Sequence, residues 1–133
     1  MSSWLLVEDE PDLYDILMHL YEMYTTEVIA YTTGEDVLSW LDRISLTDNI
    51  QRNNLPIFGL IDIRLPGEIN GIELARRLRL HPLLKHMPIV LMTAYRLSSK
   101  QEREAMKYSG ANRLIYKPLP SFKKMWQMFS ELT

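Results

Sequence analysis

The chain has 133 residues and a net charge of −2, with 47% hydrophobic and 24% charged residues. This length is enough for one domain with a real hydrophobic core, and the composition is that of a globular chain rather than a disordered one. The small net charge sets up no field for nucleic acid or an anionic membrane, and no apolar run approaches the roughly 20 residues of a membrane span.

The chain has no cysteine, which excludes disulfides and thiolate metal sites. Its first residues, Met1-Ser2-Ser3, lead into an apolar run without a basic segment or a cleavage site, so no signal peptide is expected. Both observations fit a protein of the reducing cytoplasm.

Five short apolar runs read as β-strands. They cover residues 4–7, 27–31, 57–61, 89–92 and 113–116. Each is followed by a segment with apolar residues at helical spacing, which predicts five helices. These helices are expected at residues 11–24, 34–44, 70–80, 98–108 and 121–132.

Local signals support several of the helix ends. Pro11 suits a first helical turn, and Leu13, Ile16, Leu17 and Leu20 recur at helical spacing behind it. Asn70 and the serines at 98–99 are candidate N-caps, and Gly110 is a likely helix stop. The polar stretch 45–54 reads as a surface loop before the third strand.

Five βα units in succession predict an α/β protein, a doubly wound five-stranded parallel sheet covered by helices on both faces. Functional sites of such sheets lie at the carboxyl ends of the strands. Five polar residues fall at those ends: Glu8, Asp9, Asp62, Thr93 and Lys117. A carboxylate at the end of a buried strand is costly unless a partner compensates it, so we expect these side chains to meet.

Four short motifs, in this order and spacing, resemble the receiver domain of response regulators in two-component signalling, which has a CheY-like, flavodoxin-like fold. They are Leu6-Val7-Glu8-Asp9-Glu10-Pro11, Ile61-Asp62-Ile63-Arg64-Leu65-Pro66-Gly67, Met92-Thr93-Ala94 and Tyr116-Lys117-Pro118. The resemblance covers about residues 3–131, which predicts a single receiver domain over residues 1–133 with no output domain.

Asp62 is the candidate nucleophile, forming an aspartyl phosphate. Asp9 and Asp62, with one backbone carbonyl, would form an oxygen-rich site for Mg²⁺. The resemblance implies that this carbonyl belongs to Arg64 and that Glu8 acts through a metal-bound water. Lys117 would contact a phosphoryl oxygen.

Three side chains complete the site that the resemblance implies. Thr93 would donate its hydroxyl to a second phosphoryl oxygen. Arg64 and Tyr95 flank the site in this family and modulate the lifetime of the phosphate. We expect a bulky pair at these positions to shield the acyl phosphate from water.

The sequence departs from the family in the loop at residues 66–71, which looks one residue longer than the commonest version, and at a position just before the lysine. Receiver domains usually carry Tyr or Phe three residues before the lysine, and this chain has Leu114 there. By strand alternation, Tyr116 is expected to point to the other face of the strand and to be a poor substitute. The rotamer switch that the family uses is therefore in question.

Two stripes of aromatic and methionine side chains are candidate partner surfaces, because such patches are typical of interfaces. They consist of Tyr14, Met18 and Tyr21 on the first helix and Trp126 and Met128 on the last. The resemblance implies docking of a sensor histidine kinase or histidine phosphotransfer protein near the first helix. It also implies a downstream protein target, and a homodimer through the last helix is compatible with it. An equally simple interpretation is that these side chains lie along the surface.

The function expected from the sequence is a phosphoryl-accepting switch, with Mg²⁺ as cofactor and protein partners, rather than an enzyme with a turnover substrate. One alternative is a pseudo-receiver that binds proteins independently of phosphorylation, which Leu114 favours. An aspartyl phosphohydrolase usually has a second Asp two residues after the first, where this chain has Arg64. A nucleotide-binding domain would need a Gly-rich loop after the first strand, and none is present.

Overall fold

The computed structural model describes residues 3–12, 14–15, 19, 27–45 and 55–132. Five parallel strands form one sheet with the order β2-β1-β3-β4-β5. The strands are β1 (Ser3–Val7), β2 (Glu27–Tyr31), β3 (Phe58–Asp62), β4 (Ile89–Thr93) and β5 (Arg113–Tyr116). The predicted CheY-like α/β fold is confirmed.

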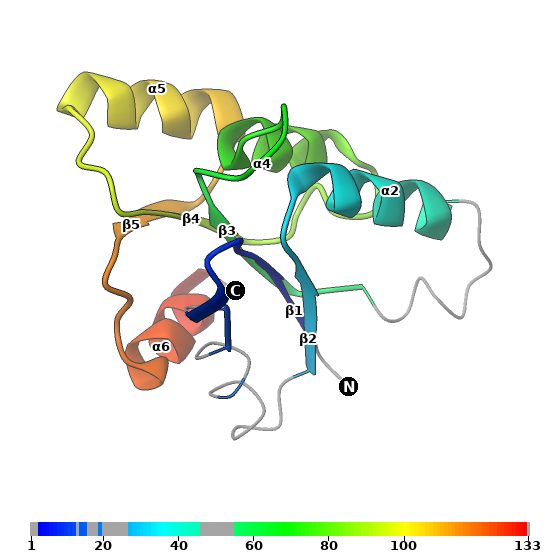
Figure 1. Ribbon diagram of the computed structural model, residues 1–133, viewed down its shortest axis with the longest axis horizontal. Helices are drawn as coiled ribbons and strands as arrows, with labels where there is room; N and C mark the ends of the chain where they lie inside the picture. The colour runs from blue at the N-terminus through cyan, green and yellow to red at the C-terminus, as the bar shows by residue number, and fades with distance from the viewer. Residues whose placement is uncertain (1–2, 13, 16–18, 20–26, 46–54, 133) are drawn as a thin grey trace.

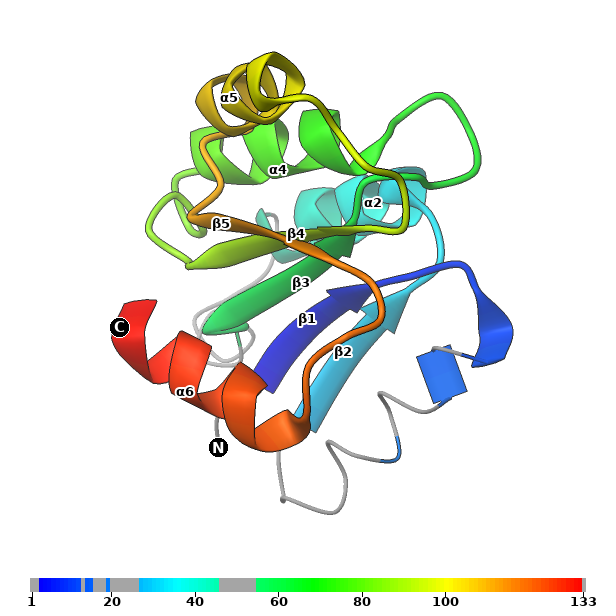
Figure 2. The ribbon, with the colours of Figure 1, turned by 90° about the vertical axis from the view of Figure 1, so that its left-hand side faces the viewer.

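Helices cover both faces of the sheet (Figures 1 and 2). Within the described residues they are α2 (Gly34–Ser45), α4 (Gly71–Leu80), α5 (Ser99–Ser109) and α6 (Phe122–Leu132). The first three lie on one face of the sheet and α6 on the other. No described helix is long and apolar enough to cross a membrane.

Alternation along the strands divides the apolar side chains between two cores. On the side of α2 and α4, Leu5, Val7, Ile61 and Leu91 pack with residues that include Leu74. On the side of α6, the intervening strand residues pack with the helix. This second core contains Trp4, Leu6, Phe58, Leu60, Val90, Met92, Met125 and Phe129. The central strands are buried on both sides, which explains their continuous apolar runs.

The predicted caps are confirmed for two helices. The side chain of Asn70 accepts a hydrogen bond from the Glu73 amide at 2.9 Å. Ser98 and Gln101 form a reciprocal capping box at the start of α5. Gly110 ends α5 in the left-handed region, with φ of 72°. These local bonds set where each helix begins and ends relative to the sheet.

Arg79 fastens the edge of the sheet at which β4 and β5 begin. Its guanidinium donates to the carbonyls of Gly110, Lys85 and Met87 at 2.7–3.0 Å. It also donates to Oδ1 of Asn112, which accepts the Ile89 amide as well. Burial lowers the pKa of this guanidinium, and its neutral acceptors satisfy the donors that burial removes from water. One side chain therefore ties α4 to the end of α5 and to the starts of two strands.

Two differences from the sequence prediction concern element limits. Asp62 and Thr93 are the last residues of β3 and β4 rather than the first residues beyond them. The expected helix 11–24 falls largely outside the described residues, and only Pro11, Asp12, Tyr14, Asp15 and His19 are seen in helical conformation. Leu13, Ile16, Leu17, Met18, Leu20 and Tyr21 lie outside the described part of the chain.

Candidate functional site at the carboxyl edge of the sheet

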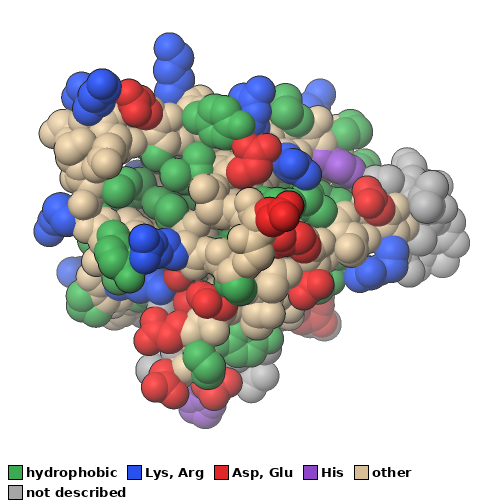
Figure 3. Space-filling view, turned by 45° about the horizontal axis from the view of Figure 1, so that its top comes forward, with side chains coloured by type: hydrophobic (Ala, Val, Ile, Leu, Met, Phe, Trp, Pro, Cys, Tyr) green, Lys and Arg blue, Asp and Glu red, His purple; other side chains and the backbone are tan. Residues whose placement is uncertain are grey.

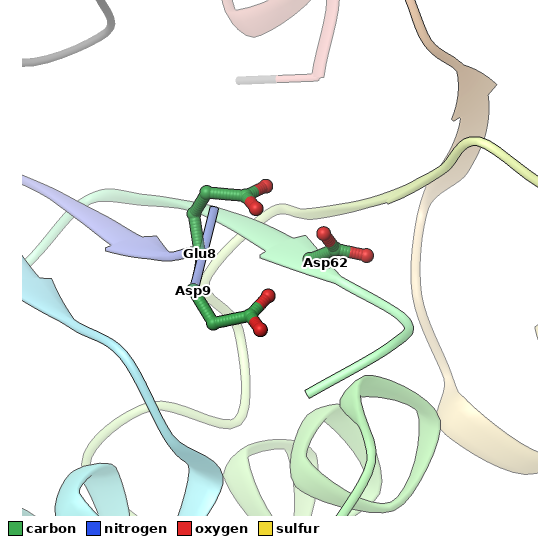
Figure 4. A group of neighbouring side chains, drawn as sticks. All are labelled: Glu8, Asp9 and Asp62. Carbon is green, nitrogen blue, oxygen red and sulfur yellow. The ribbon is translucent and has the colours of Figure 1, made fainter. Parts of the chain in front are cut away.

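The acidic residues predicted from strand ends lie together. Glu8 and Asp9 follow β1, Asp62 ends the neighbouring β3, and one carboxylate oxygen of each lies within 4.8 Å of the others (Figure 4). Parallel pairing of β1 with β3 brings these strand ends side by side. Glu8 is fully buried and Asp62 is 5% exposed, whereas Asp9 is exposed. The cluster thus extends from the sheet edge to solvent.

Lys117 neutralises part of this charge. It follows β5, and its Nζ donates to Oδ2 of Asp62 at 2.7 Å and to Oε2 of Glu8 at 2.9 Å. Glu10, to which the sequence analysis gave no role, places a third carboxylate 3.9 Å away. In the sequence, Glu10 could have been noticed because it directly follows the acidic pair Glu8 and Asp9. The lysine predicted to contact a phosphoryl oxygen therefore pairs with the acids.

Burial raises the pKa of Glu8 to about 7. The backbone amide of Glu10 and the Lys117 ammonium oppose this rise, and the nearby Asp62 carboxylate adds to it. For Lys117, burial alone would lower the pKa. Its hydrogen bonds to Asp62 and Glu8 outweigh burial, so the pKa lies above its ordinary value. The site therefore holds its lysine charged and resists ionisation of its most buried acid.

Thr93 lies at the same edge and is 1% exposed. Its Oγ accepts a hydrogen bond from the Tyr95 amide at 3.1 Å, and its carbonyl accepts from the Lys117 amide at 2.8 Å. The peptide bond between Lys117 and Pro118 is cis. Thr93 is thus attached both to the loop after β4 and to the lysine.

These groups open into a cavity of about 410 Å³. It is lined by Glu8, Asp9, Glu10, Pro11, Asp62, Arg64, Ala94, Tyr95 and Lys117. The guanidinium of Arg64 lies 3.9 Å from the centre of the Tyr95 ring, within the range of a cation–π contact. The two residues predicted to flank the site therefore contact each other at its rim. The Arg64 amide also donates to Oδ1 of Asp62 at 3.0 Å.

Gly71 holds the Asp62 backbone in place, and the sequence analysis missed it. Its amide donates to the Ile63 carbonyl at 2.8 Å, so α4 starts directly against the end of β3. A Cβ atom built on Gly71 would lie 2.1 Å from the Asp62 carbonyl oxygen. A bare glycine one residue after the N-cap Asn70 was the available signal, because that position otherwise tolerates most side chains.

The prediction for Tyr116 was wrong. Residues 114 and 116 are two apart and share a face of the strand. Leu114 packs against the core on the side of α4, and the Tyr116 hydroxyl accepts from the Leu97 amide at 3.2 Å and donates to Glu102 of α5. Tyr116 therefore lies on the face where the family has its aromatic residue.

The expected partner residues differ in exposure. Trp126 is 46% exposed, but its ring stacks on that of Trp4 with centroids 5.8 Å apart. Met128 and Tyr14 are partly buried and pack against the core on the side of α6. Only Trp126 among these three has a large exposed apolar surface, and Met18 and Tyr21 lie outside the described part of the chain.

The donor set of the cluster fits a hard divalent cation. Three carboxylates at one place are oxygen ligands of the kind that Mg²⁺ prefers.

Charge is unevenly spread over the surface of the molecule. On the face in Figure 3, acidic side chains gather in the lower part, while lysine and arginine lie mainly toward the margins. A net charge of −2 therefore understates the local attraction for cations.

Comparisons with known proteins agree with this geometry. The family model for the response regulator receiver domain matches residues 4–129, so the chain belongs to the receiver domains of two-component signalling. Such a domain is a signalling switch rather than an enzyme with a turnover substrate. The chain is similar to an uncharacterized 14.6 kDa protein in the sodA1 3'region of Leptolyngbya boryana, at 30% identity over 86% of this chain and 78% of that protein.

Two other relatives extend the comparison. The polar-differentiation response regulator DivK of Brucella ovis is 27% identical over 89% of this chain and 85% of its own length. The receiver domain of the sensor histidine kinase PA1611 from Pseudomonas aeruginosa PAO1 shares the fold, with a TM-score of 0.77 and 21% identity over 98% of this chain and 96% of that one. That structure has a magnesium ion coordinated in its active site cleft.

Proposed function

We propose that this chain accepts a phosphoryl group on Asp62 from a sensor histidine kinase or a histidine phosphotransfer protein. The observation that carries the proposal is the contact of the Lys117 ammonium with both Asp62 and Glu8 in the lining of the acidic cavity. A nucleophilic carboxylate must approach a negatively charged phosphoryl group, and the reaction depends on charge neutralisation and positioning. Lys117 supplies a cation where that charge would develop.

In the proposed step, a carboxylate oxygen of Asp62 attacks phosphorus. The bond between phosphorus and the donor imidazole nitrogen breaks, its electron pair stays on that nitrogen, and the nitrogen takes up a proton. Lys117 then exchanges its bond to Asp62 for one to a phosphoryl oxygen. The buried hydroxyl of Thr93, at the end of the adjacent strand, donates to another. The product is an acyl phosphate.

Asp9 and Asp62, with the Arg64 backbone carbonyl, are the proposed ligands for Mg²⁺, and Glu8 would act through a bound water. When bound, the metal would neutralise charge between the carboxylates and the phosphoryl group. The clustering of the three acids supports this assignment, and the magnesium ion of the PA1611 receiver is a parallel in another protein.

The output would be a change in protein binding. Phosphorylation would shift an equilibrium between two conformations, and a downstream protein would bind one of them better. In this proposal residues 1–133 act as one receiver domain. The first helix and the Trp126 surface would meet the phosphodonor and the target, and pairing of two chains through α6 is a further form of output.

The test is uptake of phosphate by the purified chain. Incubation with acetyl phosphate and Mg²⁺, read by intact mass, should add one phosphoryl group to the wild type and none to Asp62→Asn. Asp42→Asn, on the exposed side of α2, is the matched control and should label like the wild type.

A chelator should abolish labelling of the wild type and of Asp42→Asn, because the proposed reaction uses Mg²⁺. Absence of labelling by both acetyl phosphate and a phosphorylated histidine phosphotransfer domain would contradict the proposal. Such a result would favour the alternative, a module that binds proteins without phosphorylation.

A further inference from the structure

Tyr116 joins the candidate site to a helix that lies outside it. Along the chain it directly precedes Lys117, and across the sheet its register partner is Thr93. Both neighbours belong to the proposed phosphate site. A displacement of the Lys117 or Thr93 backbone would therefore also displace Tyr116, which adjoins both residues.

The other end of the Tyr116 side chain is held by α5 and the loop before it. Its hydroxyl accepts from the Leu97 amide at 3.2 Å and donates to the Glu102 carboxylate. The guanidinium of Arg96 lies 4.4 Å from the centre of its ring. Three contacts thus hold the Tyr116 side chain against residues 96–102.

The loop held by Tyr116 is the same loop that Thr93 holds. The Thr93 hydroxyl accepts from the Tyr95 amide, two residues before Leu97. Thr93 is 1% exposed, so its side chain can move toward a new acceptor only if its surroundings shift. A phosphoryl oxygen in the cavity would accept the Thr93 O–H, and a movement of Thr93 toward it would act on residues 94–98 through the Tyr95 amide that is bonded to the Thr93 oxygen.

We propose that Tyr116 is the positioning residue that couples the phosphorylation site to α5 in this chain. In the resting state its hydroxyl holds Leu97 and Glu102. When Thr93 and Lys117 turn to the phosphoryl group, that hydroxyl leaves both partners and the first turn of α5 moves. This inference rests on the proposed function, because the phosphoryl group supplies the acceptor toward which Thr93 and Lys117 turn.

Leu114 cannot act as the coupling residue, which leaves this role open for Tyr116. An aliphatic side chain at that position has no hydroxyl and packs into the core on the side of α4. Tyr116 lies on the same face, two residues nearer to the site, and carries the polar group that can make and lose hydrogen bonds with the loop. The proposed coupling residue is therefore two residues closer to the lysine than the usual aromatic position.

The experiment compares Tyr116→Phe with the wild type by residue-resolved amide exchange and NMR chemical shifts, with and without beryllofluoride and Mg²⁺. In the wild type, beryllofluoride should change the shifts over residues 97–105 and speed exchange of the Leu97 amide by about tenfold, as expected when one partly buried hydrogen bond is lost. In Tyr116→Phe, that exchange should be fast from the start, and the response of α5 should fall below half.

Two further variants separate coupling from general loosening. Glu102→Ala removes the other end of the bond and should reduce the α5 response in the same way. Tyr108→Phe removes a different hydroxyl of α5, which bonds to Glu73 at 2.5 Å, and should leave the response unchanged. All three variants should still gain one phosphoryl group from acetyl phosphate.

The possible failures are distinct. If the wild type is labelled and Tyr116→Phe keeps the full α5 response, Tyr116 is not the coupling residue. An unchanged α5 in the labelled wild type would overturn the inference as well. If the wild type is never labelled, the proposed function fails, and this inference fails with it.

Discussion

The Nζ atom of Lys117 lies 2.7 Å from Oδ2 of Asp62, although Asp62 ends β3 and Lys117 follows β5, two strands that are not neighbours in the sheet. β4 lies between these strands, so the bond joins the two sides of β4 at the carboxyl edge of the sheet. The side chain of Lys117 is only 13% exposed and that of Asp62 6%, which makes this a partly desolvated ion pair rather than a surface contact.

Replacement of Lys117 by Met should destabilise the metal-free protein, because Asp62 and Glu8 would remain close together without a cation. We expect a loss of about 3 kcal/mol at pH 8, measured by urea unfolding. Mg²⁺ should restore more stability to this variant than to the wild type, since it replaces the missing charge. Lys123→Met, on the exposed side of α6, is the control, and an equal effect of both substitutions would contradict the assignment.

Glu8 should make the stability of the metal-free protein depend on pH. Its folded pKa of about 7 lies above the unfolded value of 4.5, so between these values the folded state binds more protons than the unfolded state. Stability from this residue is therefore present at low pH and is lost as the pH rises through about 7.

Thermal unfolding should show this as a fall in Tm of several degrees from pH 6 to pH 8, at roughly 3 °C per kcal/mol for a domain of this size. Glu8→Gln should flatten the curve over that interval. A wild-type Tm that rises between pH 6 and pH 8 would show that Glu8 is ionised in the folded protein.

The contact of Arg64 with Tyr95 should lengthen the life of an aspartyl phosphate, because the two side chains cover one side of the cavity. Alanine at either position should speed loss of the phosphate several-fold, followed by intact mass after removal of acetyl phosphate. A double variant should decay no faster than the faster single variant if the pair acts as one unit. Unchanged lifetimes in all three would exclude shielding.

Gly71→Ala should distort the site by displacing the backbone of Asp62. Its new methyl group would lie 2.1 Å from the Asp62 carbonyl, so the backbone must shift, and we expect a loss of at least about 2 kcal/mol together with weaker Mg²⁺ binding. Gly59→Ala in β3 is a suitable control, because its methyl group meets the mobile end of Met87 at 3.1 Å. Equal losses of Mg²⁺ affinity in both variants would indicate a general effect on the strand.

Hydrophobic runs and strand-end polar residues were sufficient to predict the sheet and the grouping of Glu8, Asp9, Asp62, Thr93 and Lys117. Parallel strands bring their ends to one edge, so position along the chain determines position in space. The caps at Asn70, Ser98 and Gly110 were predictable for a similar reason, since they depend on local bonds.

Long-range contacts could not be predicted in this way. The role of Gly71 depends on how closely α4 approaches β3, and the bonds of Tyr116 depend on where α5 lies over the sheet. For Tyr116 the strand period itself was misapplied, because residues 114 and 116 share a face. The Arg79 bonds likewise join segments whose proximity no local pattern indicates.

Arg79 has a mechanical consequence for α5. Its bond to the Gly110 carbonyl fixes the C-terminal end of that helix, whereas the N-terminal end is attached to the site through Tyr116. Helix α5 is about 16 Å long, so a rotation about Gly110 would displace its N-terminal end the most. A rotation of about 10° at Gly110 would carry Ser99 through about 3 Å, which is enough to break a hydrogen bond, while Ser109 would hardly move. Small rearrangements around one phosphoryl group would thus produce their largest surface displacement at the N-terminal end of α5.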